Sequence, residues 1–308
     1  MTLPAAPSRA RRLVYLGTPE LAVPPLVALH DAGFDIKLVV SRPDKRRGRG
    51  SLLVASPVKA AALARGIPVS DNPADAAGAE AELGVVVAYG RLIKTDVLQA
   101  LPMVNLHFSL LPRWRGAAPV ERSILAGDAE TGVCLMAVAP ELDTGDVYAC
   151  GRLVISPDDT LDGLRSRLVT VGTALLINGL TEGLAPPQPQ TGPVTYAAKI
   201  EPEEYRLRFD RPALELHRVI RLGRAWCEFR GRRLKVLTAR INTDPQCADG
   251  GQPGQPGQPG QPGQLIGPVV ATGEGGLRLV EVQPEGKQPM PVEAWLNGAQ
   301  LQTGDRLE

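Results

Sequence analysis

The first half of the chain alternates short apolar runs with stretches whose apolar residues recur at helical spacing. The apolar runs that we expect to be strands are residues 12–17, 36–40, 83–88 and 103–108. The helical patterns between them cover residues 20–32, 56–65 and 97–100. This alternation predicts an α/β fold with a mostly parallel, doubly wound sheet.

The same architecture continues to a Pro-rich segment near residue 186. Apolar runs at 132–138 and 147–155 predict two more strands, which flank a turn at 142–146. A leucine stripe in 161–184 predicts a long helix packed on the sheet. We therefore expect a first domain at residues 1–205, with a linker from about residue 185.

From residue 206 the pattern changes to short β-rich runs separated by Gly turns. The runs at 233–239, 265–271 and 276–282 have the spacing of a small barrel or sandwich, which predicts a second domain at 206–308. The triplet Gln-Pro-Gly is repeated four times within 252–264. We interpret this repeat as a disordered insertion without a folded role.

Composition narrows the class of protein. At 308 residues the chain can form two domains, and its apolar runs are far shorter than the ~20 residues of a membrane helix. The N-terminus shows no apolar segment typical of a signal peptide. The four cysteines have neither Cys-x-x-Cys spacing nor histidine partners. We therefore expect a cytoplasmic protein with reduced thiols, no structural metal and no membrane contact.

The stretch with the clearest chemical character begins at Asn105. Asn105 and His107 are two residues apart at the end of a predicted strand, so their side chains share one face of the sheet. A histidine in a strand is more often a satisfied core residue than a catalytic one. Its pairing with an amide where the strand ends favours a functional role. The other two histidines, His30 and His217, are expected at the surface.

A second candidate is Asp143, in the sequence Leu-Asp-Thr-Gly-Asp at 142–146. Asp-Thr-Gly occurs in aspartic proteases, but those enzymes need two such carboxylates and this chain has one. Asp143 could simply bond its own backbone in the turn. If it meets His107, the three groups suit acyl transfer to an amine. Asn105 would stabilise an oxyanion, His107 would move protons, and Asp143 would orient the imidazole.

The sequence Asn-Leu-His-Phe-Ser-Leu-Leu-Pro-Arg-Trp-Arg-Gly-Ala-Ala-Pro at 105–119, followed by 142–146, resembles the formyltransferase family that uses 10-formyltetrahydrofolate. The Trp-Arg-Gly-Ala-Ala-Pro version is similar to the members that act on methionyl initiator tRNA. Supporting segments occur in the expected order at 16–19, 42–50, 87–90 and 195–200.

The resemblance implies a fold, a reaction and a set of site residues. The fold is a Rossmann-like formyltransferase domain followed by an OB-like β-barrel that binds tRNA. The reaction is formyl transfer from 10-formyltetrahydrofolate to the α-amine of initiator Met-tRNA, without a covalent intermediate. The implied catalytic residues are Asn105, His107 and Asp143. The implied folate-binding residues are Ser109, Leu110, Leu111, Pro112, Tyr89 and Gly90, and the implied tRNA-binding residues are Arg42, Lys45, Arg46, Arg47 and Arg49.

Charge distribution supports a polyanionic partner. The formal net charge is only +1, yet residues 206–240 contain eleven basic and three acidic residues. A second basic segment lies at 42–49, and we interpret it as a mobile loop. The sequence Gly17-Thr18-Pro19 lacks the Gly-x-Gly-x-x-Gly of dinucleotide sites, so no NAD is expected. We expect a monomer.

Three alternatives stay open at this point. The chain could formylate a sugar nucleotide or another small amine, hydrolyse the formyl-folate, or bind RNA without catalysis. The Gln-Pro-Gly insertion and the compact stretch at 219–226 depart from the family pattern in the last third of the chain.

Overall fold

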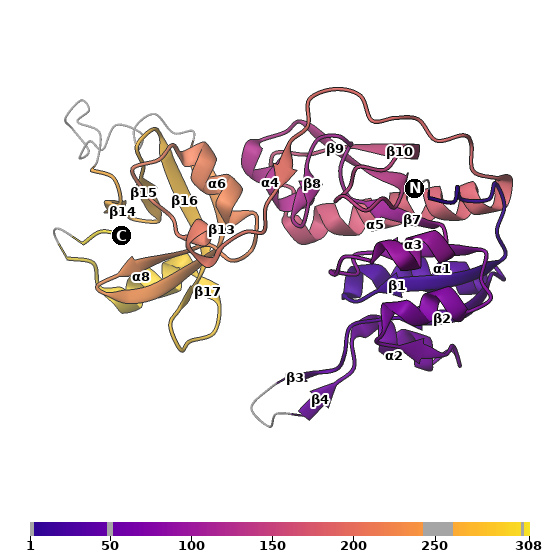
Figure 1. The fold of residues 1–308 in the computed structure, drawn as a ribbon. Coiled ribbons are helices and arrows are strands. Elements are labelled where there is room, and N and C mark those ends of the chain that lie inside the picture. The colour runs from indigo at the N-terminus through magenta and orange to yellow at the C-terminus, as the bar shows by residue number, and fades with distance from the viewer. Residues whose placement is uncertain (1–2, 48–51, 243–260, 303–304) are drawn as a thin grey trace. The chain divides into compact units, whose positions relative to one another are not determined.

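The computed structural model describes residues 3–47, 52–242, 261–302 and 305–308 (Figure 1). The chain divides into two compact units. The first consists of residues 1–122, 129–155 and 163–199, and the second of 123–128, 156–162 and 200–308. The predicted boundary at residue 206 stays a prediction. Within the described residues, no helix is long and apolar enough to cross a membrane.

A seven-stranded sheet forms the centre of the first unit. Its strand order is β10-β9-β7-β6-β1-β2-β5. The strands are β1 Arg12–Gly17, β2 Asp35–Val40, β5 Val69–Ser70, β6 Leu83–Val87, β7 Met103–His107, β9 Glu130–Ala137 and β10 Val147–Val154. The first five are parallel to one another, whereas β9 pairs antiparallel with β7, and β10 pairs antiparallel with β9 at the edge. The predicted mostly parallel α/β sheet is confirmed.

Local sequence accounts for the helices around this sheet. They are η1 Glu20–Ala22, α1 Val23–Asp31, α2 Pro57–Leu63, η2 Pro73–Gly78, α3 Thr95–Ala100 and α5 Leu161–Glu182. Helix α4, Pro119–Ala126, begins in the first unit and ends in the second. At the start of α2, the Ser56 hydroxyl accepts a hydrogen bond from the Lys59 amide at 3.0 Å. Pro57 occupies the first turn, where no amide hydrogen is needed, so local sequence accounts for the start of this helix.

Helix α5 covers one face of β7 and leaves the other face available for a catalytic site. Gly172 of α5 packs close to Leu106 and Val133, as the position of an added Cβ shows: it would lie 3.6 and 3.1 Å from their side-chain carbons. Leu106 and Val133 therefore point toward this helix. Because side chains alternate along a strand, Asn105 and His107 point to the opposite face of the sheet.

The second unit is built on an antiparallel sheet in the order β12-β13-β16-β15-β14, with β17 paired to β16. Its elements are η3 Pro202–Tyr205, α6 Ala213–Ile220, β12 Trp226–Phe229, β13 Arg232–Asn242, β14 Leu265–Ile266, β15 Val269–Ala271, β16 Gly276–Pro284, β17 Met290–Pro291 and α8 Val292–Ala299. The C-terminal residues bridge both edges of this sheet, through Leu307 with Phe229 and Arg306 with Gln264. The sheet is thereby closed on itself, as the predicted small barrel requires.

Two expectations from the sequence concern His217 and the Gln-Pro-Gly repeat, and the structure contradicts the first. His217 is 5% exposed, not at the surface, because its face of α6 packs into the core with Leu216 and Ile220. Most of the Gln-Pro-Gly repeat, residues 252–260, lies outside the described residues.

The expectation of reduced thiols is wrong for one pair. Cys134 of β9 and Cys150 of β10 are joined by a disulfide. They stand directly opposite each other in the antiparallel ladder, with Cα atoms 4.2 Å apart. Sixteen residues separate them, so no local spacing rule could reveal the pairing. Cys227 is a free, buried thiol, and Cys247 lies outside the described residues.

Candidate active site

The structure brings His107 and Asp143 together. The imidazole Nδ1 of His107 lies 3.5 Å from Oδ2 of Asp143, and their side chains are 5% and 11% exposed. This distance is within ion-pair range but longer than a firm hydrogen bond. A buried pair of this kind at a strand end favours a functional Asp143 over a turn residue that bonds only its own backbone.

The other nitrogen of His107 is also engaged. Nε2 lies 2.9 Å from the carbonyl oxygen of Trp114. A carbonyl can only accept, so Nε2 must carry a hydrogen in this arrangement. Trp114 has a positive φ of 63°, which lets the chain turn back so that its carbonyl reaches the ring. His107 is thus oriented from both sides.

The turn that carries Asp143 is tightly constrained. Asp143 has a φ of +53°, a region that Asp tolerates better than most residues. Its Oδ2 accepts a hydrogen bond from the Gly116 amide at 2.8 Å. A Cβ on Gly145 would lie 1.9 Å from the Ala137 carbonyl oxygen, so only glycine fits there. The Asp-Thr-Gly sequence therefore fits a turn pressed against the end of β9.

Asn105 completes the set predicted to be catalytic. It is on the same face of β7 as His107 and is partly exposed, whereas Leu106 between them is buried. Across the ladder, Asn105 stands opposite Met136 and His107 opposite Cys134. The amide is therefore accessible beside the buried imidazole.

Residues 109–112, expected to bind folate, form a compact loop after β7. The buried Ser109 hydroxyl donates to the carbonyl of Arg113 at 2.5 Å, so it closes the loop on itself. Leu110 packs over Gly132 of β9, where a Cβ would lie 2.4 Å from its Cδ2. Leu111 stays partly exposed, and a cis peptide bond links it to the buried Pro112. The apolar residues of the loop are thus available to a ring system.

The turn at Tyr89 and Gly90 lies beside Arg42. Tyr89 is 2% exposed and packs in the core, while Gly90 is exposed with a φ of +76°. Nη1 of Arg42 is 3.8 Å from the position of a Cβ on Gly90. The Nε atom of Arg42 is buried without a hydrogen-bond partner among the described residues. An unsatisfied buried donor is unusual and suits a polar ligand at this turn.

Part of the basic segment forms a strand. Lys45–Arg47 form strand β3, which pairs antiparallel with β4, Leu52–Val54, where the sequence predicts a mobile loop. Residues 48–51, and with them Arg49, lie outside the described residues. The one acidic residue of the segment, Asp44, is paired with Lys59 at 2.8 Å.

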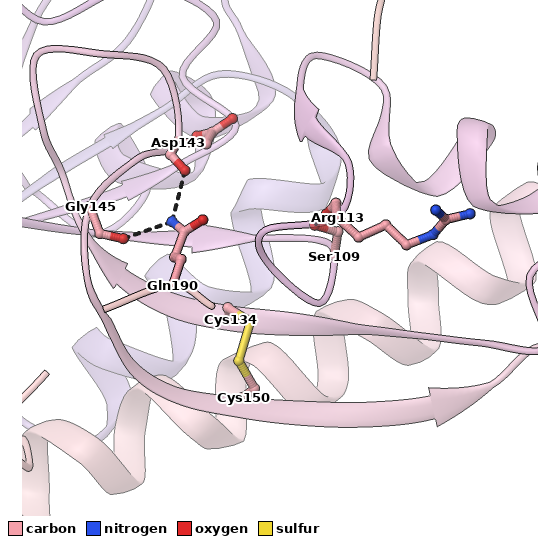
Figure 2. Close-up of a disulfide and its surroundings, with 7 residues drawn as sticks. All are labelled: Ser109, Arg113, Cys134, Asp143, Gly145, Cys150 and Gln190. Atoms are coloured by element: carbon pink, nitrogen blue, oxygen red, sulfur yellow. Dashed lines mark hydrogen bonds between the residues drawn. A yellow bond between two sulfur atoms is a disulfide. The ribbon is translucent and has the colours of Figure 1, made fainter. Parts of the chain in front are cut away.

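Sequence reasoning missed one side chain at the site. Gln190, in the segment predicted as a linker, hydrogen-bonds the carbonyls of Asp143 and Gly145 (Figure 2). No motif marks it, because the partners are 45 and 47 residues away. Among the described residues there is also no group of three or more His, Cys, Asp or Glu side chains that could hold a metal ion.

Comparisons with known proteins agree with this geometry. Residues 11–180 match the family described as Formyl transferase, and residues 199–300 match the family described as Formyl transferase, C-terminal domain. The chain is 42% identical to a methionyl-tRNA formyltransferase of Symbiobacterium thermophilum, with 96% of this chain and 95% of that protein aligned. It is 41% identical to a methionyl-tRNA formyltransferase of Paracoccus denitrificans, over 96% of this chain and all of that protein.

Solved structures share the fold at low sequence identity. An N-formyltransferase from Helicobacter canadensis, in complex with folinic acid and dTDP-3-aminofucose, has a TM-score of 0.65 at 15% identity, covering 91% of this chain and 99% of that one. HypX from Aquifex aeolicus in complex with tetrahydrofolic acid has a TM-score of 0.64 at 15% identity, covering 94% of this chain and 47% of that one.

Proposed function

The chain belongs to the formyltransferase family, and from this membership we propose that it transfers a formyl group from 10-formyltetrahydrofolate to the α-amine of methionyl initiator tRNA. Two near-full-length relatives carry that activity in their names. The observation that carries the proposal is the approach of Asp143 to His107, on the sheet face that also bears Asn105.

The residues divide the chemical work among them. When bound, 10-formyltetrahydrofolate supplies the formyl carbon, which the neutral amine attacks. Asn105 donates its amide N–H to the formyl oxygen as negative charge develops there. The proton that the attacking nitrogen loses passes to the pair formed by His107 and Asp143, whose Nδ1 and Oδ2 atoms face each other at 3.5 Å. The new C–N bond replaces the bond to folate nitrogen, which leaves with a proton.

The folate would lie against the loop of residues 109–112 and the turn at 89–90. Leu110 and Leu111 offer apolar contact, and the guanidinium of Arg42, whose Nη1 lies 3.8 Å from the position of a Cβ on Gly90, offers hydrogen-bond donors. A heteroaromatic ring with polar edges needs both kinds of contact. Of the predicted folate-binding residues, Leu110, Leu111 and Gly90 are exposed enough to contact the co-substrate. Ser109, Pro112 and Tyr89 are buried, so we propose that they shape the loop and the turn.

Two basic regions suit the tRNA. In the first unit, Arg42 precedes the hairpin, Lys45, Arg46 and Arg47 lie on its strand β3, and Arg49 follows in the same basic segment. In the second unit, the exposed positions of β13 include Arg233, Lys235 and Arg240. Phosphate contacts of this kind supply much of the affinity for nucleic acid. We propose that the enzyme acts as a monomer in the cytoplasm, which gel filtration and fractionation would test.

The deciding assay compares initiator and elongator Met-tRNA with 10-formyltetrahydrofolate as donor. Formylation of the initiator, with much slower formylation of the elongator, is the expected result. Formate release without transfer, or transfer only to a sugar nucleotide, would contradict the proposal.

Replacement of His107 tests the chemical step. We expect His107→Ala to lower kcat by ~10²–10⁴-fold with little change in folate affinity, because the ring acts on protons and contacts folate little. Equal activity in the correctly folded variant would exclude this role. Circular dichroism and a thermal melt supply the folding control.

A further inference from the structure

Gln190 holds no place in the proposed reaction, yet its amide is bound on every side. We propose that Gln190 is a positioning residue that keeps the Asp143 carboxylate facing His107, and this inference rests on the formyl transfer proposed above. Gln190 lies between α5 and β11, Tyr196–Ala197, in the segment that follows the Pro-rich run.

The amide group joins two separate parts of the site. Its Nε2 donates to the carbonyl of Asp143 at 2.9 Å and to the carbonyl of Gly145 at 2.8 Å (Figure 2). Its Oε1 accepts from Nε and Nη2 of Arg115, at 3.1 and 2.7 Å. Both amide hydrogens and the oxygen are thereby used, so the side chain is fixed in one orientation.

These bonds close a ring around the carboxylate. Arg115 is followed by Gly116, and together they form β8, Arg115–Gly116. The Gly116 amide donates to Oδ2 of Asp143 at 2.8 Å, the same oxygen that lies 3.5 Å from His107. Gln190 therefore binds the backbone of the Asp143 turn directly. Through Arg115 it also fixes strand β8, whose Gly116 amide binds the Asp143 carboxylate.

The turn needs such support because its conformation is costly. Asp143 has a positive φ, which Asp tolerates better than most residues but which still raises the free energy of the turn. Without the two bonds from Gln190, the carbonyls of Asp143 and Gly145 can rotate toward water, and the carboxylate can leave the imidazole. A displacement of about 1 Å in a catalytic array can cost ~10²-fold in rate.

Two variants separate the bonds of Gln190. Gln190→Met keeps the length of the side chain and loses every bond. Gln190→Glu keeps an acceptor for Arg115 but replaces the donor with a carboxylate oxygen that repels both carbonyls. Gln188→Met is the matched control, since among the described residues the Gln188 side chain donates to the nearby Pro186 carbonyl alone, at 3.3 Å. The backbone bonds of Gln188 with Val147 do not depend on its side chain.

The kinetic test uses the full chain with 10-formyltetrahydrofolate and initiator Met-tRNA. We expect both Gln190 variants to lower kcat by ~10–100-fold with the two KM values within about twofold of wild type, and Gln188→Met to match wild type. Wild-type kcat in either Gln190 variant, a loss confined to KM, or an equal loss in Gln188→Met would overturn the proposal.

A spectroscopic readout keeps this result distinct from failure of the proposed function. The ¹⁵N signals of the His107 ring and the Gly116 amide report the two contacts of the Asp143 carboxylate without any substrate. We expect both signals to shift in the Gln190 variants and to stay in place in Gln188→Met. Unchanged signals would overturn the positioning role. An inactive wild type with shifted signals would instead refute the formyl transfer alone.

Discussion

At the scale of single residues, the site depends on a carboxylate held at one end of an imidazole. His107 lies between the Trp114 carbonyl and Asp143, and both partners sit in loops with positive φ. These backbone conformations raise the free energy of the two loops, and the contacts with His107 offset that increase. The chemistry of Asp143 can therefore be separated from its backbone role by a substitution that tolerates the same φ.

Asp143→Asn is that substitution. Asn also tolerates positive φ, and its side-chain oxygen can still accept the bond from the Gly116 amide. We expect kcat to fall by at least ~10²-fold because the charge facing His107 is lost, with a change in unfolding free energy within about 1 kcal/mol. Steady-state kinetics and denaturant unfolding measure the two effects. Full activity in the variant would show that only shape matters at this position.

At the scale of elements, neighbouring strands and packed helices create contacts that depend on register. The β9–β10 ladder places Cys134 opposite Cys150, and the β7–β9 ladder places Cys134 opposite His107. The disulfide therefore lies on the strand next to the candidate catalytic histidine. In the second unit, α6 buries His217, whose Nε2 lies 3.7 Å from Asp158.

The disulfide predicts a specific pattern of thiol reactivity. In protein purified without reductant, peptide mapping should recover Cys134 linked to Cys150. Burial raises the pKa of the Cys227 thiol to about 12, so Cys227 should resist alkylation until the chain is unfolded. Mass spectrometry of native and denatured samples measures both. Recovery of alkylated Cys134 from the native, unreduced protein would contradict the pairing.

Buried His217 predicts a pH-dependent stability. Burial and the positive charge of Arg221 lower the pKa of His217 below its usual value near 6.5, despite the opposing effect of Asp158. The unfolded chain then binds more protons than the folded one as pH falls below about 6.5, so folding is favoured above that pH and loses stability on acidification. Denaturant unfolding from pH 7.5 to 5 should show a steeper loss for wild type than for His217→Gln. Parallel curves would argue against this contribution.

At the scale of the whole molecule, near-neutral charge hides two strongly basic regions. Residues 206–240 carry an excess of eight positive charges in a chain whose formal net charge is +1. Clustered cations bind a polyanion by displacing its counterions, which makes affinity fall with salt. Nucleic-acid binding should therefore depend on salt far more than folate binding does.

Lys235 offers a test of that dependence. We expect Lys235→Ala to weaken tRNA binding and to reduce the slope of log affinity against log salt by about 0.7–0.9, the value for one phosphate contact. Lys37→Ala is the control, because Lys37 is already neutralised by Asp35 at 2.6 Å. Fluorescence titration of initiator tRNA at several salt concentrations measures the slopes. An unchanged slope for Lys235→Ala would remove this lysine from the contact surface.

Much of the fold followed from patterns within short segments. Strand β1 was expected at residues 12–17 and occurs there, because alternation and burial are local properties. The hairpin β3–β4 was not expected, because its charged residues do not show the alternation typical of a strand. Helix α8 was not expected either, because its short, mixed pattern shows no clear helical period. Asn105 and His107 could be paired from the sequence because a spacing of two residues places both on one face of a strand.

The sequence alone determined the order of the elements, the residues at the end of β7 and the family that they resemble. The tertiary structure decided which distant groups meet: Asp143 with His107, Cys134 with Cys150, and Gln190 with the Asp143 turn. The physical reason is that these contacts depend on the register and packing of segments 16 to 47 residues apart. Local periodicity indicates on which face of a helix or strand a side chain lies. Which side chains from distant segments come into contact is decided only when the chain folds.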